Sequence, residues 1–303
     1  MRAYLSVILV LGLAAFGCKH EPGSASLTTG ALKVEVDESV YKALENESTE
    51  FQGLYPDAKL KLQKAEARVA ISDFGLDSVG VITIARELTK EERDLFTGAK
   101  IPLDEYKIAL SAVAVIVHPS NPMKQVRLTE LDSIFTGTMT RWPGGKLIEA
   151  YAANPHSSVN LAFRTTVLGG AEFGRTIEYV DSSAQRIARV AKTPEAIALV
   201  SVNYLHGMEG SVTVLAVGGP TYRPDTTAAP GQYYAPWQAY MFLGYYPINS
   251  PVYMYSRVVD TDISLGFISF VCSGPGQKII QNNGLVPVTM PVRLVSLTSQ
   301  QVK

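Results

Sequence analysis

Residues 108–117 read IALSAVAVIV, the longest apolar run of the chain after its first 30 residues. A run of this length is too short to cross a bilayer as a helix, which takes about 20 residues. Pro119 and Pro122 follow it, and proline ends regular structure. The run therefore predicts a long, buried strand.

Strand and helix patterns alternate on both sides of this run. Strands are also expected at 32–36, 58–62, 79–84, 159–163, 212–217 and 252–255. Helices are expected at 40–51, from 89, at 129–135, from 171, from 193, at 263–271 and at 276–282. Thr89 with Glu92, and Thr129 with Asp132, form the capping pattern that opens helices. The alternation favours an α/β architecture with mostly parallel sheets.

The composition excludes several classes of protein. The chain has 303 residues, with 27 Lys and Arg against 28 Asp and Glu, and 47% of its residues are hydrophobic. So much apolar material indicates folded cores, and the missing basic excess argues against nucleic acid as a partner. Four His and two Cys exclude a zinc-ribbon or disulfide scaffold. No His lies near a Ser or Cys in a nucleophile motif, so we predict no enzyme, no metal site and no cofactor.

The first 17 residues are predicted to be a signal peptide. Met1 and Arg2 supply a positive charge, and residues 3–17 carry no charge and include an apolar core. The segment Ala14-Ala15-Phe16-Gly17-Cys18 resembles a bacterial lipobox, which implies cleavage before Cys18 and lipidation of its thiol. The alternative is an ordinary signal peptide followed by a chance cysteine.

Residues 18–30 contain the lipidated cysteine and a polar, flexible tether. The lipid would hold the mature protein on the extracytoplasmic side of a membrane, in the cell envelope. Contact with the membrane would be through this lipid anchor only.

Four segments are informative through their order. Residues 114–142 read AVIVHPSNPMKQVRLTELDSIFTGTMTRW, residues 192–205 read KTPEAIALVSVNYL, and residues 267–287 read FISFVCSGPGQKIIQNNGLVP. Tyr246-Pro247-Ile248 precedes the strand expected at 252–255. Together they resemble, in the same order, segments of the PstS-type phosphate-binding proteins of ABC transporters, which are type II periplasmic binding proteins.

The resemblance implies two lobes, each a mostly parallel sheet flanked by helices, that close on a ligand between them. Two domains also agree with the length of the chain. Lobe I would combine residues 31–113 with 246–303, and lobe II would be residues 114–245. The family further implies inorganic phosphate or a similar oxyanion as ligand, ABC permease subunits as partners, and a monomeric protein.

A desolvated oxyanion needs several hydrogen-bond donors, which helix N-termini, hydroxyl groups and arginine supply. The first candidate segment is Asp37-Glu38-Ser39, between a predicted strand and a predicted helix. The family has Gly-Ser-Ser or Gly-Ser-Thr here, so only Ser39 matches and is taken as ligand-binding. Asp37 and Glu38 would repel an anion, and the alternative is that they cap the helix.

A second candidate segment is 164–170, RTTVLGG, directly after the strand expected at 159–163. The family has Arg, an Asp two residues later and then Ser-Gly-Thr, so Arg164 and Gly169 match and Thr166 replaces the Asp. The candidates for anion binding here are Arg164, Thr165, Thr166, Gly169 and Gly170. Arginine would supply a bidentate fork, and the glycines would present backbone N–H groups. The alternative is a plain glycine-rich turn.

Arg86 is the third candidate for the anion site. It follows the strand expected at 79–84 and would add positive charge to the cleft. The alternative is a surface ion pair with a nearby glutamate.

The sequence therefore predicts a lipid-anchored substrate-binding component of an ABC importer that closes on phosphate or a similar oxyanion. The alternative is a surface adhesion or interaction lipoprotein that keeps the fold without transport. The aromatic stretch 222–246, which includes Tyr233, Tyr234, Trp237 and Tyr240, would supply protein contacts in that case. These aromatic residues would otherwise pack the second lobe and the hinge.

Overall fold

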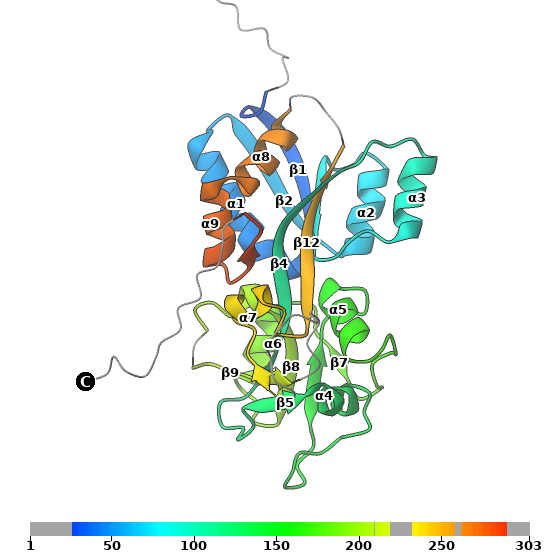
Figure 1. Cartoon of the computed structure of the whole chain (residues 1–303), viewed down its shortest axis with the longest axis vertical. Helices are drawn as coiled ribbons and strands as arrows, with labels where there is room; N and C mark the ends of the chain where they lie inside the picture. Colours follow the sequence, from blue (N-terminus) through cyan, green and yellow to red (C-terminus); the bar gives the residue numbers. More distant parts are fainter. Residues whose placement is uncertain (1–25, 209, 219–231, 258–261, 290–303) are drawn as a thin grey trace, which may run out of the picture.

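The computed structural model describes residues 26–208, 210–218, 232–257 and 262–289. The chain forms two lobes, one above the other in Figure 1, which are joined by two long strands. The predicted signal peptide at 1–17 and Cys18 lie outside the described residues. Within the described part of the chain, no helix has the length and apolar character needed to cross a membrane.

Strands of both lobes form one path of hydrogen-bonded neighbours. The upper lobe contributes β1 (Gly30–Asp37), β2 (Ala58–Ala65) and β3 (Val81–Ile84). The lower lobe contributes β6 (Glu149–Ala152), β7 (Glu178–Tyr179) and β8 (Ala196–Ser201). Between them run β4 (Asp104–Val117) and β12 (Asn249–Ser256). The order along the path is β2-β1-β3-β12-β4-β8-β6-β7.

The strand β4 belongs to both lobes. Its first part, Asp104–Ala112, pairs with β12, and its second part, Val113–Val117, pairs with β8. Apart from the partly buried Leu110, residues 108–117 are buried, so the long buried strand expected from the sequence is confirmed. The Tyr246 hydroxyl, which is also buried, donates to the Val113 carbonyl (2.6 Å) where β4 changes partner.

The sheet is mixed. β1 pairs in parallel with β2 and β3, and β6 pairs in parallel with β7 and β8. β4 and β12 run antiparallel to each other and to the strands beside them, because the chain crosses between the lobes in both directions. The two-lobed α/β fold is confirmed, but these crossing strands make the sheet less parallel than the sequence suggested.

Short strands complete the architecture. β9 (Thr213–Val214) and β13 (Val286–Pro287) add to β4. A separate small sheet contains β5 (Gln125–Arg127), β10 (Ala216–Gly218) and β11 (Tyr233–Tyr234). The strand expected at 212–217 is thus divided into β9 and β10, which pair with different partners.

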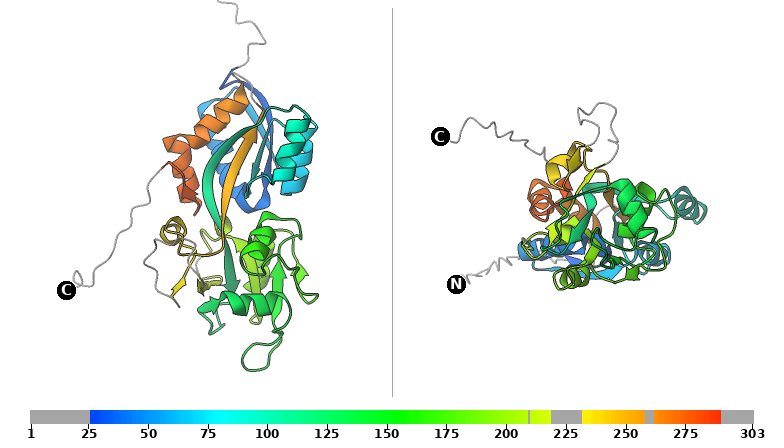
Figure 2. Two further views of the ribbon diagram at one scale, coloured as in Figure 1. Left: turned by 45° about the vertical axis from the view of Figure 1, so that its right-hand side comes forward. Right: turned by 90° about the horizontal axis from the view of Figure 1, so that it is seen from below.

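Helices flank the strands of each lobe. The upper lobe has α1 (Tyr41–Leu54), α2 (Ala67–Gly75), α3 (Lys90–Gly98), α8 (Ile263–Cys272) and α9 (Gly274–Asn282). The lower lobe has α4 (Leu128–Phe135), α5 (Ser158–Thr166), α6 (Ser183–Val190) and α7 (Gln238–Phe242). Short 3-10 turns are η1 (Glu38–Val40) and η2 (Val202–Tyr204). Figure 2 shows α8 and α9 on one side of the crossing strands and α2 and α3 on the other.

The prediction of a strand at 159–163 is wrong, because this segment lies in helix α5. The pattern VNLAF fits alternation, but Val159 and Phe163 are buried four residues apart while Leu161 is 42% exposed. That spacing is helical. The Ser157 hydroxyl caps the helix by accepting the N–H of Asn160 (3.2 Å).

Three helix starts are also corrected. Thr193-Pro194-Glu195 forms a turn before β8, and the residues after Ala171 have no helix until α6. At the start of α4 the Glu130 carboxylate accepts the backbone N–H of Arg127 (2.8 Å), two residues before the expected Thr129. The Thr89–Glu92 box at α3 is confirmed.

The chain is attached to the upper lobe from Leu27 onward. A Cβ atom at Gly266 of α8 would lie 1.7 Å from the Leu27 carbonyl oxygen, so only glycine permits this close approach. Gly30 already belongs to β1, within the segment 18–30 that was predicted as a tether. Leu27 therefore rests against α8.

Glu47 is a buried carboxyl group in α1. It has no exposed surface, and neither carboxyl oxygen has a hydrogen-bond partner among the described residues. Burial, with a smaller contribution from Glu50, raises the pKa of Glu47 to about 9. The folded protein therefore keeps this proton at neutral pH, while the unfolded chain releases it.

We expect Glu47→Gln to stabilise the protein at neutral and alkaline pH. Between the ordinary glutamate pKa and the folded value of about 9, the folded state binds the extra proton, so stability falls as pH rises. This site alone contributes a slope of about 1.4 kcal/mol per pH unit, which the glutamine variant should lack. Urea unfolding at several pH values measures the slope, with the exposed Glu45→Gln as control. Equal slopes for wild type and E47Q would contradict the assignment.

Candidate functional site

A cavity of about 220 Å³ lies between the two lobes, and we call it the interlobe pocket. The upper lobe contributes Asp37, Glu38, Lys64, Ala65 and Glu66, and the lower lobe contributes Asn154, Ser157, Asp181 and Ser182. A cavity in this position can be closed over a ligand by movement of the lobes.

The strands bring these residues together because parallel strands end at the same edge of a sheet. Asp37 ends β1, and Ala65 ends the neighbouring strand β2. In the lower lobe, Asn154 follows the end of β6 and Asp181 follows the end of β7. Ligand sites of open α/β sheets lie at this edge.

Asp37 connects the two lobes. Its Oδ1 accepts hydrogen bonds from the backbone N–H (2.9 Å) and the hydroxyl (2.6 Å) of Ser39. Its Oδ2 accepts one from the hydroxyl of Ser158 (2.5 Å), the first residue of α5. Asp37 is the N-cap of η1, so the capping alternative is confirmed for this residue.

Glu38 occupies the N-terminus of α6 in the opposite lobe. Its carboxylate accepts hydrogen bonds from the backbone N–H (2.8 Å) and the hydroxyl (3.3 Å) of Ser183, and the Arg186 guanidinium lies 3.8 Å away. Helix N-terminal N–H groups are unpaired and carry partial positive charge, which favours an anion. The α6 N-terminus thus already holds an internal carboxylate.

Burial sets the electrostatics of this contact. It raises the pKa of Glu38, against the opposing effects of Arg186 and Ser183. Arg186 is completely buried, and burial lowers its pKa. Its guanidinium also donates to the carbonyl of Val180 and to the hydroxyl of Ser183 (2.8 Å), so it supports the chain around the start of α6.

The turn that carries both carboxylates is held by the lower lobe. The Ser39 carbonyl accepts hydrogen bonds from the Ser201 hydroxyl (2.6 Å) and the Asn203 amide (3.4 Å). The Tyr204 hydroxyl donates to the Glu38 carbonyl (3.1 Å). The two lobes are therefore in direct contact beside the pocket.

None of the seven residues predicted to bind an anion, all of which the structure describes, lines the interlobe pocket. Ser39 is buried behind it and donates its hydroxyl to Asp37. Arg86 binds both carboxylate oxygens of Glu92 (2.7 Å each), so the ion-pair alternative is confirmed.

The five residues of the second predicted segment lie at the C-terminal end of α5 and in the turn after it. The last turn of α5 holds Arg164, Thr165 and Thr166, and the turn that follows holds Gly169 and Gly170. Arg164 donates to two carbonyls of this turn (3.0 Å each) and pairs with Glu172 (2.5 Å). A helical rise of about 1.5 Å per residue places Arg164 about 9 Å along the axis from Ser158. A role of these five residues in anion binding stays a prediction.

Six polar residues of the pocket were missed from the sequence, namely Lys64, Glu66, Asn154, Ser157, Asp181 and Ser182. Ser182 caps α6 by accepting the N–H of Gln185 (3.2 Å), and a serine three residues before glutamine is a recognisable helix start. That pattern could have located it. Lys64 has no comparable signal, because it is one of three lysines in β2.

The fold and the interlobe pocket define a two-lobed α/β protein with a cavity between its lobes at the edge of its strands. A family model described as "PBP superfamily domain" matches residues 23–274. The chain belongs to the PBP superfamily.

Known proteins of similar sequence and structure agree with this class. The phosphate-binding protein PstS of Bacillus subtilis (strain 168) is 26% identical over 297 residues, which cover 95% of this chain and 92% of that protein. A similar solved structure is that of a phosphate ABC transporter substrate-binding protein from Clostridium perfringens with bound phosphate. It has a TM-score of 0.72 at 22% identity, and the match covers 86% of this chain and 100% of that chain. An ABC-type phosphate transport receptor from Vibrio cholerae has a TM-score of 0.64 at 18% identity, with coverages of 86% and 100%. Both structural likenesses show the fold.

We expect Arg186→Met to destabilise the protein by about 3 kcal/mol, because it leaves Glu38 without its buried counter-charge. In a Glu38→Gln background the same change should destabilise less, since glutamine brings no charge to α6. Urea unfolding of wild type, both single variants and the double variant measures this coupling. Equal losses in both backgrounds would mean that Arg186 acts only through its hydrogen bonds to Val180 and Ser183.

Proposed function

We propose that this chain is the substrate-binding component of an ABC importer and takes phosphate or a similar oxyanion into the interlobe pocket. The observation that carries the proposal is the meeting of two lower-lobe helix N-termini, those of α5 and α6, at this pocket, where their donors already hold two carboxylates of the upper lobe. The relatives named for phosphate binding and phosphate transport support the same class of ligand.

Four groups in the pocket would donate hydrogen bonds to the ligand. Lys64 brings an ammonium group, Asn154 brings an amide, and Ser157 and Ser182 bring hydroxyl groups. The oxygen of each serine accepts a helix N–H, which leaves its hydroxyl hydrogen to point at an oxyanion. This is a donor set for a small, compact anion.

The acidic residues of the pocket favour a protonated oxyanion. Asp37, Glu38, Glu66 and Asp181 line the pocket together with Lys64, so a fully deprotonated ion such as sulfate meets repulsion. Phosphate retains a proton near neutral pH and can donate it to a carboxylate. We therefore expect a preference for phosphate over sulfate.

The proposal places the protein on the extracytoplasmic side of a membrane. A signal peptide at 1–17 and lipidation of Cys18 belong to the proposal, and both lie outside the described residues. The protein would act as a monomer without catalytic activity and deliver its ligand to ABC permease subunits. The proposed lobe boundary near residue 113 is supported by the change of strand partner between Ala112 and Val113.

Isothermal titration of the purified protein with phosphate tests the ligand, and we expect saturable binding with sulfate as a poor competitor. Lys64→Gln should weaken phosphate binding about tenfold, because the ligand loses a nearby positive charge. Lys61→Gln is the matched control, since Lys61 is exposed on the same strand and is not part of the pocket lining. Absence of phosphate binding, or equal losses in both lysine variants, would overturn this assignment.

Arg164→Gln tests the hypothesis drawn from the sequence in the same titration. We expect little change in affinity, because turn carbonyls and Glu172 already hold the guanidinium. A loss as large as that of Lys64→Gln would instead assign Arg164 to the ligand.

We expect Glu38→Gln to tighten phosphate binding about tenfold at alkaline pH. The variant removes one negative charge from the pocket and keeps an oxygen that accepts the Ser183 N–H. Burial raises the pKa of Glu38 in the folded protein, so the wild-type protein takes up a proton there as pH falls and loses the same charge.

The ratio of the wild-type to the E38Q dissociation constant should therefore fall toward one as pH is lowered. Taking the ratio at each pH cancels the ionisation of phosphate itself. A ratio that does not vary with pH would contradict this role of Glu38.

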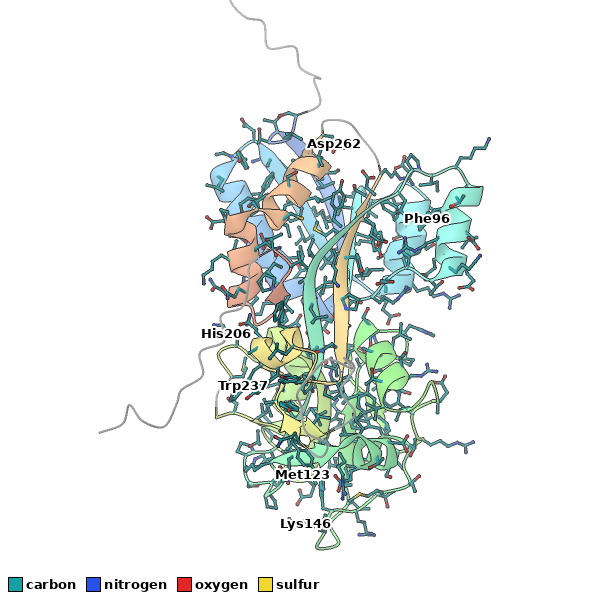
Figure 3. All side chains as sticks on the ribbon, viewed as in Figure 1. Phe96, Met123, Lys146, His206, Trp237 and Asp262 are labelled. Atoms are coloured by element: carbon teal, nitrogen blue, oxygen red, sulfur yellow. The ribbon has the colours of Figure 1, made fainter. Side chains whose placement is uncertain are left out.

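A surface interaction protein is the second candidate function. Trp237, which is labelled in Figure 3, is 65% exposed. Its ring stacks on that of Tyr240, with 5.8 Å between ring centroids. The neighbouring aromatic residues pack inward, since Tyr246 is buried and Tyr234 contacts Tyr240 and Tyr245. A wild-type protein that binds neither phosphate nor sulfate would favour this second function.

A further inference from the structure

A second cavity, of about 550 Å³, lies at the far end of the lower lobe, and we call it the distal pocket. Met123 and Lys146, which line it, are labelled at the foot of the molecule in Figure 3. Glu195 lines it just before β8, whereas Ser201 ends β8 and bonds to Ser39 beside the interlobe pocket. This length of strand separates the two cavities by about 20 Å.

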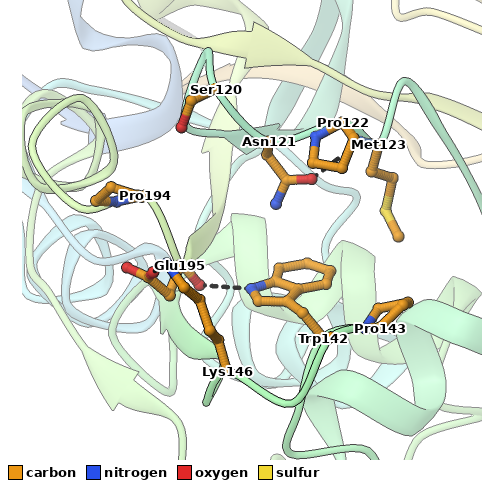
Figure 4. Close-up of a pocket in the computed structure, with 10 residues that line it drawn as sticks. Ser120, Asn121, Pro122, Met123, Trp142, Pro143, Lys146, Pro194 and Glu195 are labelled. Carbon is orange, nitrogen blue, oxygen red and sulfur yellow. Dashed lines mark hydrogen bonds and ion pairs between the residues drawn. The ribbon is translucent and has the colours of Figure 1, made fainter.

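The walls of the distal pocket are mainly apolar, and they come from the loops after β4, around 142–146 and before β8. The apolar residues are Pro122, Met123, Trp142, Pro143 and Pro194. Trp142 donates its indole N–H to the Glu195 carbonyl (2.9 Å), so its ring offers the cavity only apolar surface (Figure 4). Apolar walls with a few polar groups, and a volume of roughly 300–1,000 Å³, are typical of small-molecule sites.

Asn121 points a hydrogen-bond donor into this cavity, as Figure 4 shows. Its side chain belongs to a residue that is only 7% exposed, and its Oδ1 accepts the N–H of Met123 (2.9 Å). This contact fixes the amide and leaves Nδ2 with no partner among the described residues. The donor therefore faces the cavity, where the acceptor oxygen of a ligand can replace the water that would otherwise take its hydrogen bond.

Glu195 supplies an acceptor on another wall of the same cavity. Its carboxylate pairs with Lys146 at the rim, and this pairing lowers the pKa of Glu195, so the carboxylate stays charged. The distal pocket therefore combines one fixed donor, one acceptor and a flat apolar ring.

We propose that the distal pocket binds a small planar ring that carries a carboxamide or lactam group. The ligand carbonyl would accept from Asn121 Nδ2, its N–H would donate to Glu195, and its ring would lie against Trp142. The site is independent of the proposed phosphate site.

Benzamide is the probe, and Trp142 is the reporter. Trp237→Phe removes the other tryptophan of the chain, so fluorescence in this background comes from Trp142 alone. We expect saturable quenching with a dissociation constant on the order of 1 mM, as suits so small a ligand. Cyclohexanecarboxamide, which has the same amide on a puckered ring, should bind several-fold more weakly.

Asn121→Asp is the decisive variant. It keeps the oxygen that accepts the Met123 N–H and replaces the Nδ2 donor with an acceptor, so benzamide should bind at least tenfold more weakly. Lys64→Gln in the interlobe pocket is the control and should leave benzamide binding unchanged. Unchanged binding in N121D, or no saturation in the parent protein, would overturn the proposal.

A second measurement does not depend on how well N121D folds. The Trp142 indole N–H resonance of the Trp237→Phe protein should shift on addition of benzamide and stay in place on addition of phosphate. A shift with phosphate and none with benzamide would also overturn the proposal, whatever the outcome for the interlobe pocket.

Discussion

The contact between the Glu38 carboxylate and the N-terminus of α6 determines how the two lobes meet. It joins groups 145 residues apart in the chain, and Asp37 makes a parallel contact with Ser158 across 121 residues. One short turn of the upper lobe thereby supplies both anions that the lower lobe binds. The same helix ends that suit an oxyanion ligand are therefore occupied in part by the protein itself, and any ligand must bind beside these carboxylates or displace them.

The two cavities differ in chemistry because they lie at opposite ends of the strand β8. At the Ser201 end, parallel strands deliver helix N-termini and acidic residues to the lobe boundary. At the Glu195 end, proline-rich loops close over Trp142, and few polar groups remain. Peptide groups at helix starts favour charge, whereas rigid loops around an aromatic ring favour an apolar ligand. The lower lobe can therefore contribute to two sites without shared residues.

The fold could be predicted from the sequence where periodicity was unambiguous, as in β4 and in the alternating residues of β1 and β2. The prediction failed at Val159–Phe163, because so short a segment fits a strand and a helix equally. Only the cap at Ser157 decides between them. The predicted role of Arg164 depended on that strand. The partners of Asp37 and Glu38 are set by tertiary contacts over long sequence distances, which local pattern cannot reveal.

The continuity of β4 has a mechanical consequence. Residues Asp104–Ala112 of β4 are hydrogen-bonded to β12, and Val113–Val117 are hydrogen-bonded to β8. A force that pulls the lobes apart is therefore carried along the backbone of this one strand. Separation then requires rows of strand hydrogen bonds to shear together, which resists far more load than opening them one after another. Bending and twisting at the partner change demand no such rupture. The molecule should therefore be stiff under tension along β4, whereas rotation of the lobes is limited by the contacts of Asp37 and Glu38 with α5 and α6.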